Sequence, residues 1–405
     1  MKISIIQQRY GKKVLGGAET LGALIARLLA PHHEVEILTT TAVDYDTWKN
    51  VFPPGTTAED GFQVRRFPVQ QGRTPEFDRL TDVIHLNCAA GEFPLLNTSE
   101  RDQFLRRLRN LPDGVQEKFI QAQGPIAPGI GEHLRQNQPD AALFMTYLYP
   151  TTYDGLLAVP PDRANIVPTL HDEIPAYLPV FGRRISRARL LCCTNSEIAL
   201  AARLYPDVPL RTEKLGFGLG LPKDEVRPPK SPPFLLYAGR IDAHKGVPDL
   251  MKWYAEMRDL HSDPPRLVLI GGKGPEYQRL PGVEVRGFVS EEEKLELMRT
   301  ALAFVHPSPF ESLGIVLLEA LACRTPVIVT KKSEVMVEHC RESQAGVWIE
   351  NGAELAAITK RLSSGDLRRE LGDRGRRWVE REYSIESYTG RLLQAFPVSA
   401  PPPAP

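Results

Sequence analysis

Cysteine is scarce in this sequence, and its few copies form no motif. The chain has 405 residues and five cysteines, none of which stands in a C-x-x-C pair. Several lie within apolar runs, which is typical of reduced, buried thiols in a reducing compartment. We therefore expect a cytoplasmic protein that does not depend on disulfide bonds.

Excess charge and long apolar runs are also missing. Lysine plus arginine number 50, as do aspartate plus glutamate, so no net basic field favours a nucleic-acid partner. No apolar run is long enough to cross a bilayer, and residues 1–6 are typical of a strand and not of a signal peptide. Peripheral contact with the inner face of a membrane stays open, and the sequence does not predict the oligomeric state.

The first predicted strand lacks the G-x-G-x-x-G fingerprint, which argues against an NAD-dependent dehydrogenase. Instead, a strand at 2–7 leads into a polar loop with Gly16 and Gly17, followed by a helix over about 18–29 and a strand at 34–39. This is the βαβ opening of a doubly wound sheet, in which glycines let the backbone approach a ligand closely. A plain connecting turn is the alternative interpretation.

A second series of alternating strands and helices begins near residue 234, which predicts a second parallel sheet covered on both faces. Residues 211–233 hold three glycines and five prolines, so we interpret them as an interdomain linker. The predicted parts of the chain are two Rossmann-like domains at 1–212 and 213–384, a terminal helix at about 385–396 that packs back on the first domain, and a disordered proline-rich tail at 397–405.

Residues 306–327 carry two carboxylates close to a predicted helix start. Apolar residues at three- and four-residue spacings predict a helix over about 313–322. Glu311 and Glu319 are eight steps apart, or about 12 Å along a helix, which is about the reach from the sugar ring to the ribose of a nucleotide sugar. The free N–H groups at the helix start suit a diphosphate. An ordinary amphipathic helix with two solvated glutamates is the alternative.

Other charged residues follow predicted strands, where open α/β sheets bind ligands. Arg240 and Lys245 lie in a glycine-bounded loop after the strand at 234–238, and two cations there suit a pyrophosphate. The alternative is a solvated basic turn. His171 follows the strand at 166–170 and could contact a sugar hydroxyl or a reacting centre, or it could be structural.

Two further patterns carry weaker predictions. Asp44-Tyr45-Asp46 has a spacing that can hold Mg²⁺ or Mn²⁺, but no apolar strand leads into it, and we predict no metal site. Arg106, Arg107 and Arg109 could face a membrane or an anionic acceptor, although a solvated helix face is the simpler interpretation.

Together these motifs resemble those of the family 4 retaining glycosyltransferases, a group of glycosyl transferases group 1. The segments that match in order and spacing are GGAE at 16–19, HDE at 171–173, AGRIDAHKG at 238–246, GFVS at 287–290 and PSPFESLGIVLLEALACRTPVI at 307–328. The resemblance implies a GT-B fold, in which two Rossmann-like domains face each other across a cleft. Two departures are Ser312-Leu313 in place of the commoner Gly-Phe and Arg324 in place of a common glycine.

The resemblance also implies roles for particular residues. Arg240 and Lys245 would bind the donor diphosphate, Glu311 the hydroxyls of the donor sugar and Glu319 the ribose. His171 would lie near the anomeric carbon. The further donor-binding positions are Gly16, Gly17, Gly239, Val289 near the nucleobase, and Ser312, Leu313 and Gly314 through their backbone N–H groups.

The implied activity is transfer of a sugar from a nucleoside-diphosphate sugar to a hydroxyl acceptor, with retention at the anomeric carbon. The acceptor would be a glycan, a glycolipid or a small molecule, as in polysaccharide biosynthesis. No covalent nucleophile is evident, so a front-face mechanism is favoured, without a metal and with no cofactor besides the nucleotide sugar, for which UDP is the favoured nucleotide. A nucleotide-sugar 2-epimerase and a non-catalytic nucleotide-sugar binding protein are the alternatives.

Overall fold

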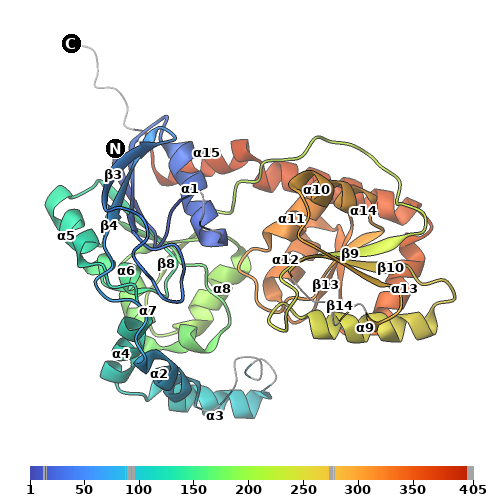
Figure 1. Cartoon of the computed structure of the whole chain (residues 1–405), viewed down its shortest axis with the longest axis horizontal. Coiled ribbons are helices and arrows are strands. Elements are labelled where there is room, and N and C mark those ends of the chain that lie inside the picture. The colour runs from blue at the N-terminus through green and yellow to red at the C-terminus, as the bar shows by residue number, and fades with distance from the viewer. Residues whose placement is uncertain are drawn as a thin grey trace. The chain divides into compact units, whose positions relative to one another are not determined.

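The chain forms two compact units, which Figure 1 colours from blue to red along the sequence. Unit 1 comprises Met1–Phe217 and Thr389–Pro405, and unit 2 comprises Gly218–Tyr388. The computed structural model describes residues 1–11, 14, 16–86, 88, 93, 96–272, 277 and 279–398. The disorder predicted for the end of the tail therefore lies outside the described residues.

Unit 1 is organised around an eight-stranded sheet in the order β3-β4-β2-β1-β5-β6-β7-β8. All neighbouring strands are parallel except β3 and β4. The strands are β1 (Lys2–Ile6), β2 (Glu34–Thr40), β3 (Gly55–Glu59), β4 (Phe62–Phe67), β5 (Ala141–Met145), β6 (Ala164–Val167), β7 (Arg189–Cys192) and β8 (Arg211–Lys214). The central strands are buried along nearly their whole length, as is usual for parallel strands with both faces covered.

Helices connect these strands and supply the apolar side chains that cover the sheet. They are α1 (Gly17–Leu29), α2 (Glu76–His85), α3 (Thr98–Arg109), α4 (Asp113–Gln123), α5 (Pro128–Asn137), α6 (Pro150–Tyr153), α7 (Pro179–Ile185) and α8 (Asn195–Leu204), with the short 3₁₀ helices η2 (Gly155–Leu157) and η3 (Ile174–Tyr177). The terminal helix α15 (Ile385–Ala395) also contacts this unit, since Arg391 Nε donates to the carbonyl oxygen of Leu215 at 2.7 Å and Arg189 Nη2 to that of Ala395 at 2.8 Å.

Unit 2 contains a six-stranded, wholly parallel sheet in the order β11-β10-β9-β12-β13-β14. Its strands are β9 (Phe234–Gly239), β10 (Arg266–Gly271), β11 (Val283–Gly287), β12 (Ala303–His306), β13 (Val327–Thr330) and β14 (Gly346–Ile349). Its helices are α9 (Val247–Leu260), α10 (Glu291–Thr300), α11 (Ile315–Ala322), α12 (Glu334–Ser343), α13 (Gly352–Leu362) and α14 (Asp366–Tyr383). The predicted fold class, two α/β domains with doubly wound parallel sheets, is confirmed.

Three local predictions were wrong. Residues 211–214 form strand β8 at the sheet edge and are not part of a linker. Helix α11 begins at Ile315, so Glu311 lies in the loop before it, and the helical rise does not give the separation of Glu311 from Glu319. A helix predicted at 198–204 with its cap at 195–197 instead begins at Asn195 as α8, and Thr194 is the N-cap whose side chain accepts from the N–H of Glu197.

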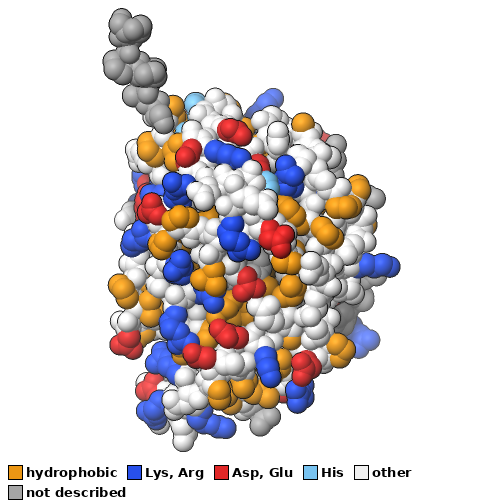
Figure 2. All heavy atoms as spheres, turned by 90° about the vertical axis from the view of Figure 1, so that its left-hand side faces the viewer, with side chains coloured by type: hydrophobic (Ala, Val, Ile, Leu, Met, Phe, Trp, Pro, Cys, Tyr) orange, Lys and Arg blue, Asp and Glu red, His pale blue; other side chains and the backbone are white. Residues whose placement is uncertain are grey.

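Charged side chains of both signs are interspersed on the face of unit 1 shown in Figure 2. In the described part of the chain, no helix combines the length and the apolar character that a bilayer crossing needs. The exposed arginines of α3 lie in its last turn, where the negative end of the helix dipole stabilises cations.

Candidate functional site

The carboxyl ends of β9 and β12 carry most of the charged residues predicted to bind a ligand. The strand order of unit 2 changes direction at this pair, because β10 and β11 extend from β9 while β13 and β14 extend from β12. Such a switch point opens a crevice in which α/β sheets bind ligands. Residues 240–246 follow β9 and residues 307–314 follow β12, so both loops border this crevice.

Gly246 brings these two loops together. Its φ is +71°, a left-handed value at which glycine carries no steric cost. A Cβ atom at this position would lie 2.3 Å from the carbonyl oxygen of Pro307, closer than two such atoms can approach. The close packing places the neighbouring Lys245 against the loop that contains Glu311.

Lys245, Glu311 and His306 form one charged cluster. The Nζ atom of Lys245 donates to Oε1 of Glu311 at 2.5 Å, and Nε2 of His306 lies 3.1 Å from the same oxygen. The Glu311 and His306 side chains are 13 % and 5 % exposed, so this carboxylate is held by two donors away from bulk water. The cluster joins a residue predicted to bind phosphate to one predicted to bind the sugar, and it adds a histidine, His306, that was not among the predicted site residues.

The partners of Glu311 keep it ionised. Burial acts to raise the pKa of this carboxyl group, but the hydrogen bond and charge of His306 and the charge of Lys245 lower it well below its usual value. Glu311 is therefore an acceptor for N–H or O–H groups and not a proton donor at neutral pH.

Arg240 is the most exposed of the four charged residues predicted to bind the donor, which are Arg240, Lys245, Glu311 and Glu319. Its side chain is 65 % exposed, and its Nε lies 3.6 Å from Oδ2 of Asp242. The Tyr237 hydroxyl donates to the backbone carbonyl of Arg240 at 2.5 Å, which fixes the backbone here. Gly239, also predicted to bind the donor, ends β9 with φ +150°. The exposed Arg240 guanidinium is thus accessible to an anion that enters the crevice.

The start of α11 offers backbone N–H groups at the same edge. Gly314 is the N-cap with φ +74°, and a Cβ there would lie 2.4 Å from Cε of Met336. Leu313 is buried, and its carbonyl oxygen lies 2.7 Å from Nε2 of His339. Ser312 is half-buried beside it. The turn is therefore fixed by its own packing, and a helix start of this kind favours anions.

Glu319 has a cationic partner that the sequence analysis missed. Nζ of Lys294, on α10, donates to Oε2 of Glu319 at 2.8 Å and lies 2.9 Å from Oε2 of Glu291. The Lys294 and Glu319 side chains are 19 % and 17 % exposed. Burial raises the pKa of Glu319, and Lys294 opposes this rise. Val289, the predicted nucleobase contact, is half-buried just before α10.

In unit 1, the predicted glycines lie at the start of α1. Gly16 is the N-cap, and a Cβ there would lie 2.0 Å from Oε2 of Glu19, whose Oε1 accepts from Nη2 of Arg9 at 2.5 Å. A Cβ on Gly17 would meet no atom of the described residues within 4 Å. Packing within unit 1 therefore explains a glycine at 16, whereas the open space at 17 leaves room for a ligand.

His171 lies in the loop after β6, and the structure shows how that loop is held. The backbone N–H groups of Leu170 and Cys193 donate to the two carboxylate oxygens of Glu197 at 2.7 and 2.6 Å. Glu197 is 1 % exposed, and burial raises its pKa to about 7 although its backbone donors oppose the rise. This carboxyl group ties the end of β6 to the end of β7 and so supports half-buried His171.

The acidic neighbours of His171 are engaged within unit 1. Asp172 accepts from the Tyr177 hydroxyl at 2.7 Å and also pairs with Arg101. Glu173 accepts from the Tyr147 hydroxyl at 2.8 Å. The side chains of Asp172 and Glu173 thus bind other residues of unit 1. Of the H-D-E motif, His171 is the residue whose side chain is most available to a ligand.

The Asp44-Tyr45-Asp46 segment is used locally. Oδ1 of Asp44 accepts from the backbone N–H groups of Asp46 and Thr47, and these bonds lower the pKa of Asp44. Asp46 lies 3.4 Å from Nη1 of Arg73. Within the described ranges, no three histidine, cysteine, aspartate or glutamate side chains gather as a metal site.

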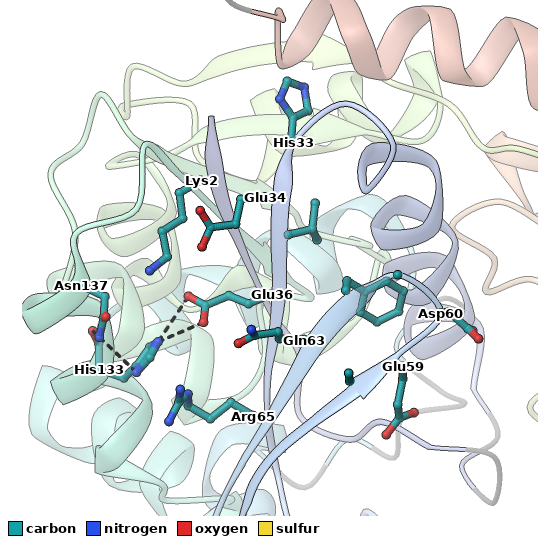
Figure 3. A pocket seen from close by; sticks show the side chains of 14 residues that line it. Lys2, His33, Glu34, Glu36, Glu59, Asp60, Gln63, Arg65, His133 and Asn137 are labelled. Atoms are coloured by element: carbon teal, nitrogen blue, oxygen red, sulfur yellow. Dashed lines mark hydrogen bonds and ion pairs between the residues drawn. The ribbon is translucent and has the colours of Figure 1, made fainter.

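A hollow of about 550 Å³ lies at the other end of the unit 1 sheet, near the first residues of β1, β2 and β4 (Figure 3). Glu36 lies at its centre, where Nε2 of His133 is 3.1 Å from Oε2 and the Ser4 hydroxyl donates to Oε1 at 2.6 Å. Glu36, His133 and Ser4 therefore provide one another with hydrogen-bond partners. The hollow is at the amino ends of the parallel strands, away from the edge where such sheets bind ligands.

Comparison with known proteins finds a family likeness in the part of the chain that contains the unit 2 site. Residues 222–378 match the family model of the glycosyl transferases group 1, so the predicted likeness to this group is confirmed over most of unit 2. An uncharacterized glycosyltransferase of Methanocaldococcus jannaschii is 25 % identical over 202 residues, which cover 46 % of this chain and 49 % of that protein. The chain thus aligns with about half the length of that relative.

Solved structures extend the likeness of fold to both units. Sucrose-phosphate synthase from Thermosynechococcus elongatus matches with a TM-score of 0.64 and 18 % identity over 98 % of both chains. HepE of Anabaena, solved with UDP-glucose, matches with a TM-score of 0.62 and 14 % identity over 98 % of this chain and 99 % of its own. At such identities the comparison shows the fold alone. The residue roles given above stay predictions.

Proposed function

We propose that this protein is a family 4 retaining glycosyltransferase, which moves a sugar from a nucleoside-diphosphate sugar to a hydroxyl acceptor. One observation carries the proposal: Lys245 and Glu311 meet at the switch point of the unit 2 sheet, inside the segment that matches the glycosyl transferases group 1 model. The cation suits a phosphate and the ionised carboxylate suits sugar hydroxyls.

Lys245 can serve both partners at once. Its ammonium group has three N–H donors, so one can stay on Glu311 while another turns to the diphosphate. Arg240, which is largely exposed, adds a second cation. In the proposed reaction the bond from the anomeric carbon to the phosphate oxygen breaks, and the two cations stabilise the negative charge that develops on the leaving group.

The acceptor oxygen then bonds to the anomeric carbon on the face that the phosphate leaves, and its proton passes to a phosphate oxygen. This front-face step retains the configuration and needs no protein nucleophile. The two cations take the part that a metal ion would otherwise play, so the proposal includes neither a metal nor another cofactor. His171 contacts the sugar near the reacting carbon in this scheme.

UDP is the favoured nucleotide of the donor, because a structure of similar fold was solved with UDP-glucose. Glycans, glycolipids and small molecules with a free hydroxyl group are the proposed classes of acceptor. The proposal also includes a cytoplasmic location with peripheral membrane contact.

The test is turnover of UDP-, GDP-, ADP- and dTDP-sugars with and without a panel of hydroxyl acceptors. Acceptor-dependent release of the nucleoside diphosphate, with an α-linked product from an α-linked donor, is the expected result. Epimerised donor formed without any acceptor would instead identify a 2-epimerase. Tight binding without turnover under any condition would identify a non-catalytic nucleotide-sugar binding protein.

A further inference from the structure

Both carboxylates predicted to hold the donor are paired with lysines, but only one of these lysines belongs to the predicted site. Glu311 pairs with Lys245, which follows β9, whereas Glu319 pairs with Lys294, which lies on α10. Lys294 also lies 2.9 Å from Glu291, at the exposed side of the pair. The cluster of Glu291, Lys294 and Glu319 therefore reaches from the surface to a half-buried carboxylate.

Lys294 connects the segments expected to hold the nucleoside. It lies in the first turn of α10, whose N-cap Ser290 directly follows Val289. Glu319 lies on α11, which packs beside α10 (Figure 1). The Lys294–Glu319 contact therefore ties the predicted nucleobase contact to the predicted ribose contact, whereas Lys245 and Arg240 lie at the diphosphate end.

From this geometry we infer that Lys294 is a positioning residue for the nucleoside half of the donor: its bond to Oε2 holds the Glu319 carboxylate in place to accept from the ribose hydroxyls. The inference rests on the proposed function, because it takes the ligand of this edge to be a nucleoside diphosphate. An ionised carboxylate accepts hydrogen bonds at both oxygens, whereas a protonated one donates from one of them. With Oε2 bound by Lys294, Oε1 of Glu319 is the oxygen left for the ribose.

The charges around Glu319 make the inference testable by pH. Burial alone raises the pKa of Glu319, and Lys294 is the cation that opposes this rise, while Glu291 reinforces it. The thiol of Cys323, at the end of the same helix, is also close to Glu319, and Arg299 and Arg376 are further charged groups around that thiol. Without Lys294, Glu319 would bind its proton more tightly and would recover its charge only at higher pH.

The experiment measures the affinity of the full-length chain for UDP, GDP, ADP and dTDP, and for inorganic pyrophosphate, by calorimetric titration. The nucleotide that binds the wild type most tightly is then compared among Lys294→Met, Lys294→Arg and Lys360→Met. Lys360 is an exposed lysine of α13 and controls for the loss of one positive charge.

Lys294→Met is expected to weaken nucleotide binding by on the order of 10- to 100-fold, because the partly buried Glu319 carboxylate loses its charged partner. Its affinity for pyrophosphate should stay at the wild-type value. Its loss of nucleotide affinity should shrink as the pH rises, because Glu319 regains its charge at higher pH. Lys294→Arg should recover most of the affinity, and Lys360→Met should match the wild type.

The inference is overturned if Lys294→Met binds the nucleotide as the wild type does, or if it loses nucleotide and pyrophosphate equally. A loss that is the same at every pH would also overturn it, because that pattern indicates only a structural role. If none of the four nucleotides binds the wild type, the proposed function fails together with the inference. If one nucleotide binds the wild type and Lys294→Met binds it with the same affinity, the inference alone fails.

Discussion

At the scale of single residues, Glu311 illustrates how a site can hold a charge ready for a ligand. Its Oε1 atom accepts from Lys245 and lies near His306, so the carboxylate stays ionised in a place with little water. The same contacts link the site to stability, because a group with a shifted pKa makes stability depend on pH.

Glu311→Gln is expected to lower the free energy of unfolding by about 1–3 kcal/mol at neutral pH, the usual cost of losing a charged hydrogen bond. The pKa of Glu311 is depressed in the folded chain. Its stabilisation is therefore present above the unfolded value of about 4.3 and is lost as pH falls below it. Urea unfolding of both proteins at pH about 7 and about 3 tests this. A difference that is as large at the lower pH would contradict the assigned ion pair.

The stability linked to Glu197 depends on pH in the opposite direction from that linked to Glu311. Burial raises its pKa to about 7 in the folded chain, so the stabilisation linked to its proton is present below about 4.3 and is lost as pH rises towards 7. The wild type should therefore lose stability relative to Glu197→Gln over this range. Unfolding midpoints of both proteins measured across it are the check, and parallel curves would speak against a buried titrating carboxyl group.

At the scale of elements, Arg324 shows a conflict between backbone and side chain. It occupies the turn after α11 with φ +59°, where a glycine would be unstrained. Its guanidinium compensates by pairing with Asp224, at 2.6 and 2.7 Å, and with Asp373. The glycine common at this position in the resembling family is thus replaced by a residue that gains two partners.

Arg324→Ala should destabilise the protein more than Arg324→Gly, by about 1 kcal/mol, because both lose the ion pairs but only glycine relieves the backbone. The ion pairs themselves should contribute little, since both aspartates are more than a third exposed. Chemical unfolding of the two variants provides the comparison. A glycine variant less stable than the alanine variant would contradict the assigned backbone strain at this position.

The elements that the sequence predicted well are those with strong apolar patterns. Strand β9 was expected at 234–238 and covers Phe234–Gly239, because a buried parallel strand is a continuous apolar run. The edge strands β3 and β8 were missed because they are short and polar. The start of α11 was predicted two residues too early. Leu313 fits the helical spacing, but Gly314, with its left-handed backbone, is the N-cap, so the helix begins at Ile315.

The candidate site shows a similar division. Arg240, Lys245 and Glu311 could be selected because they follow predicted strands in a matching motif. Lys294 could not, because its contact with Glu319 joins residues 25 positions apart on two helices, and only packing brings them together. Glu197 was noticed only as part of a helix cap, since nothing local indicates that its carboxylate binds the ends of two strands.

At the scale of the whole molecule, the two units differ in how far their function can be read from their residues. Unit 2 combines a family match, a switch point and a cluster of paired charges. Unit 1 has the same kind of sheet, with open space at Gly17 and a supported loop at His171. The acceptor is the part of the proposed reaction for which the described residues offer the least chemical constraint.

The central claim is that the carboxyl edge of the unit 2 sheet binds a nucleoside diphosphate through Lys245 and Glu319. The most direct measurement is the thermal stability of the wild type, Lys245→Ala and Glu319→Ala with millimolar UDP, GDP, ADP or dTDP, since a ligand that binds only the folded state raises the melting temperature. We expect one nucleotide to raise the melting temperature of the wild type by several degrees, and both variants to lose most of that increase. Equal increases in all three proteins, or none in the wild type, would contradict the account.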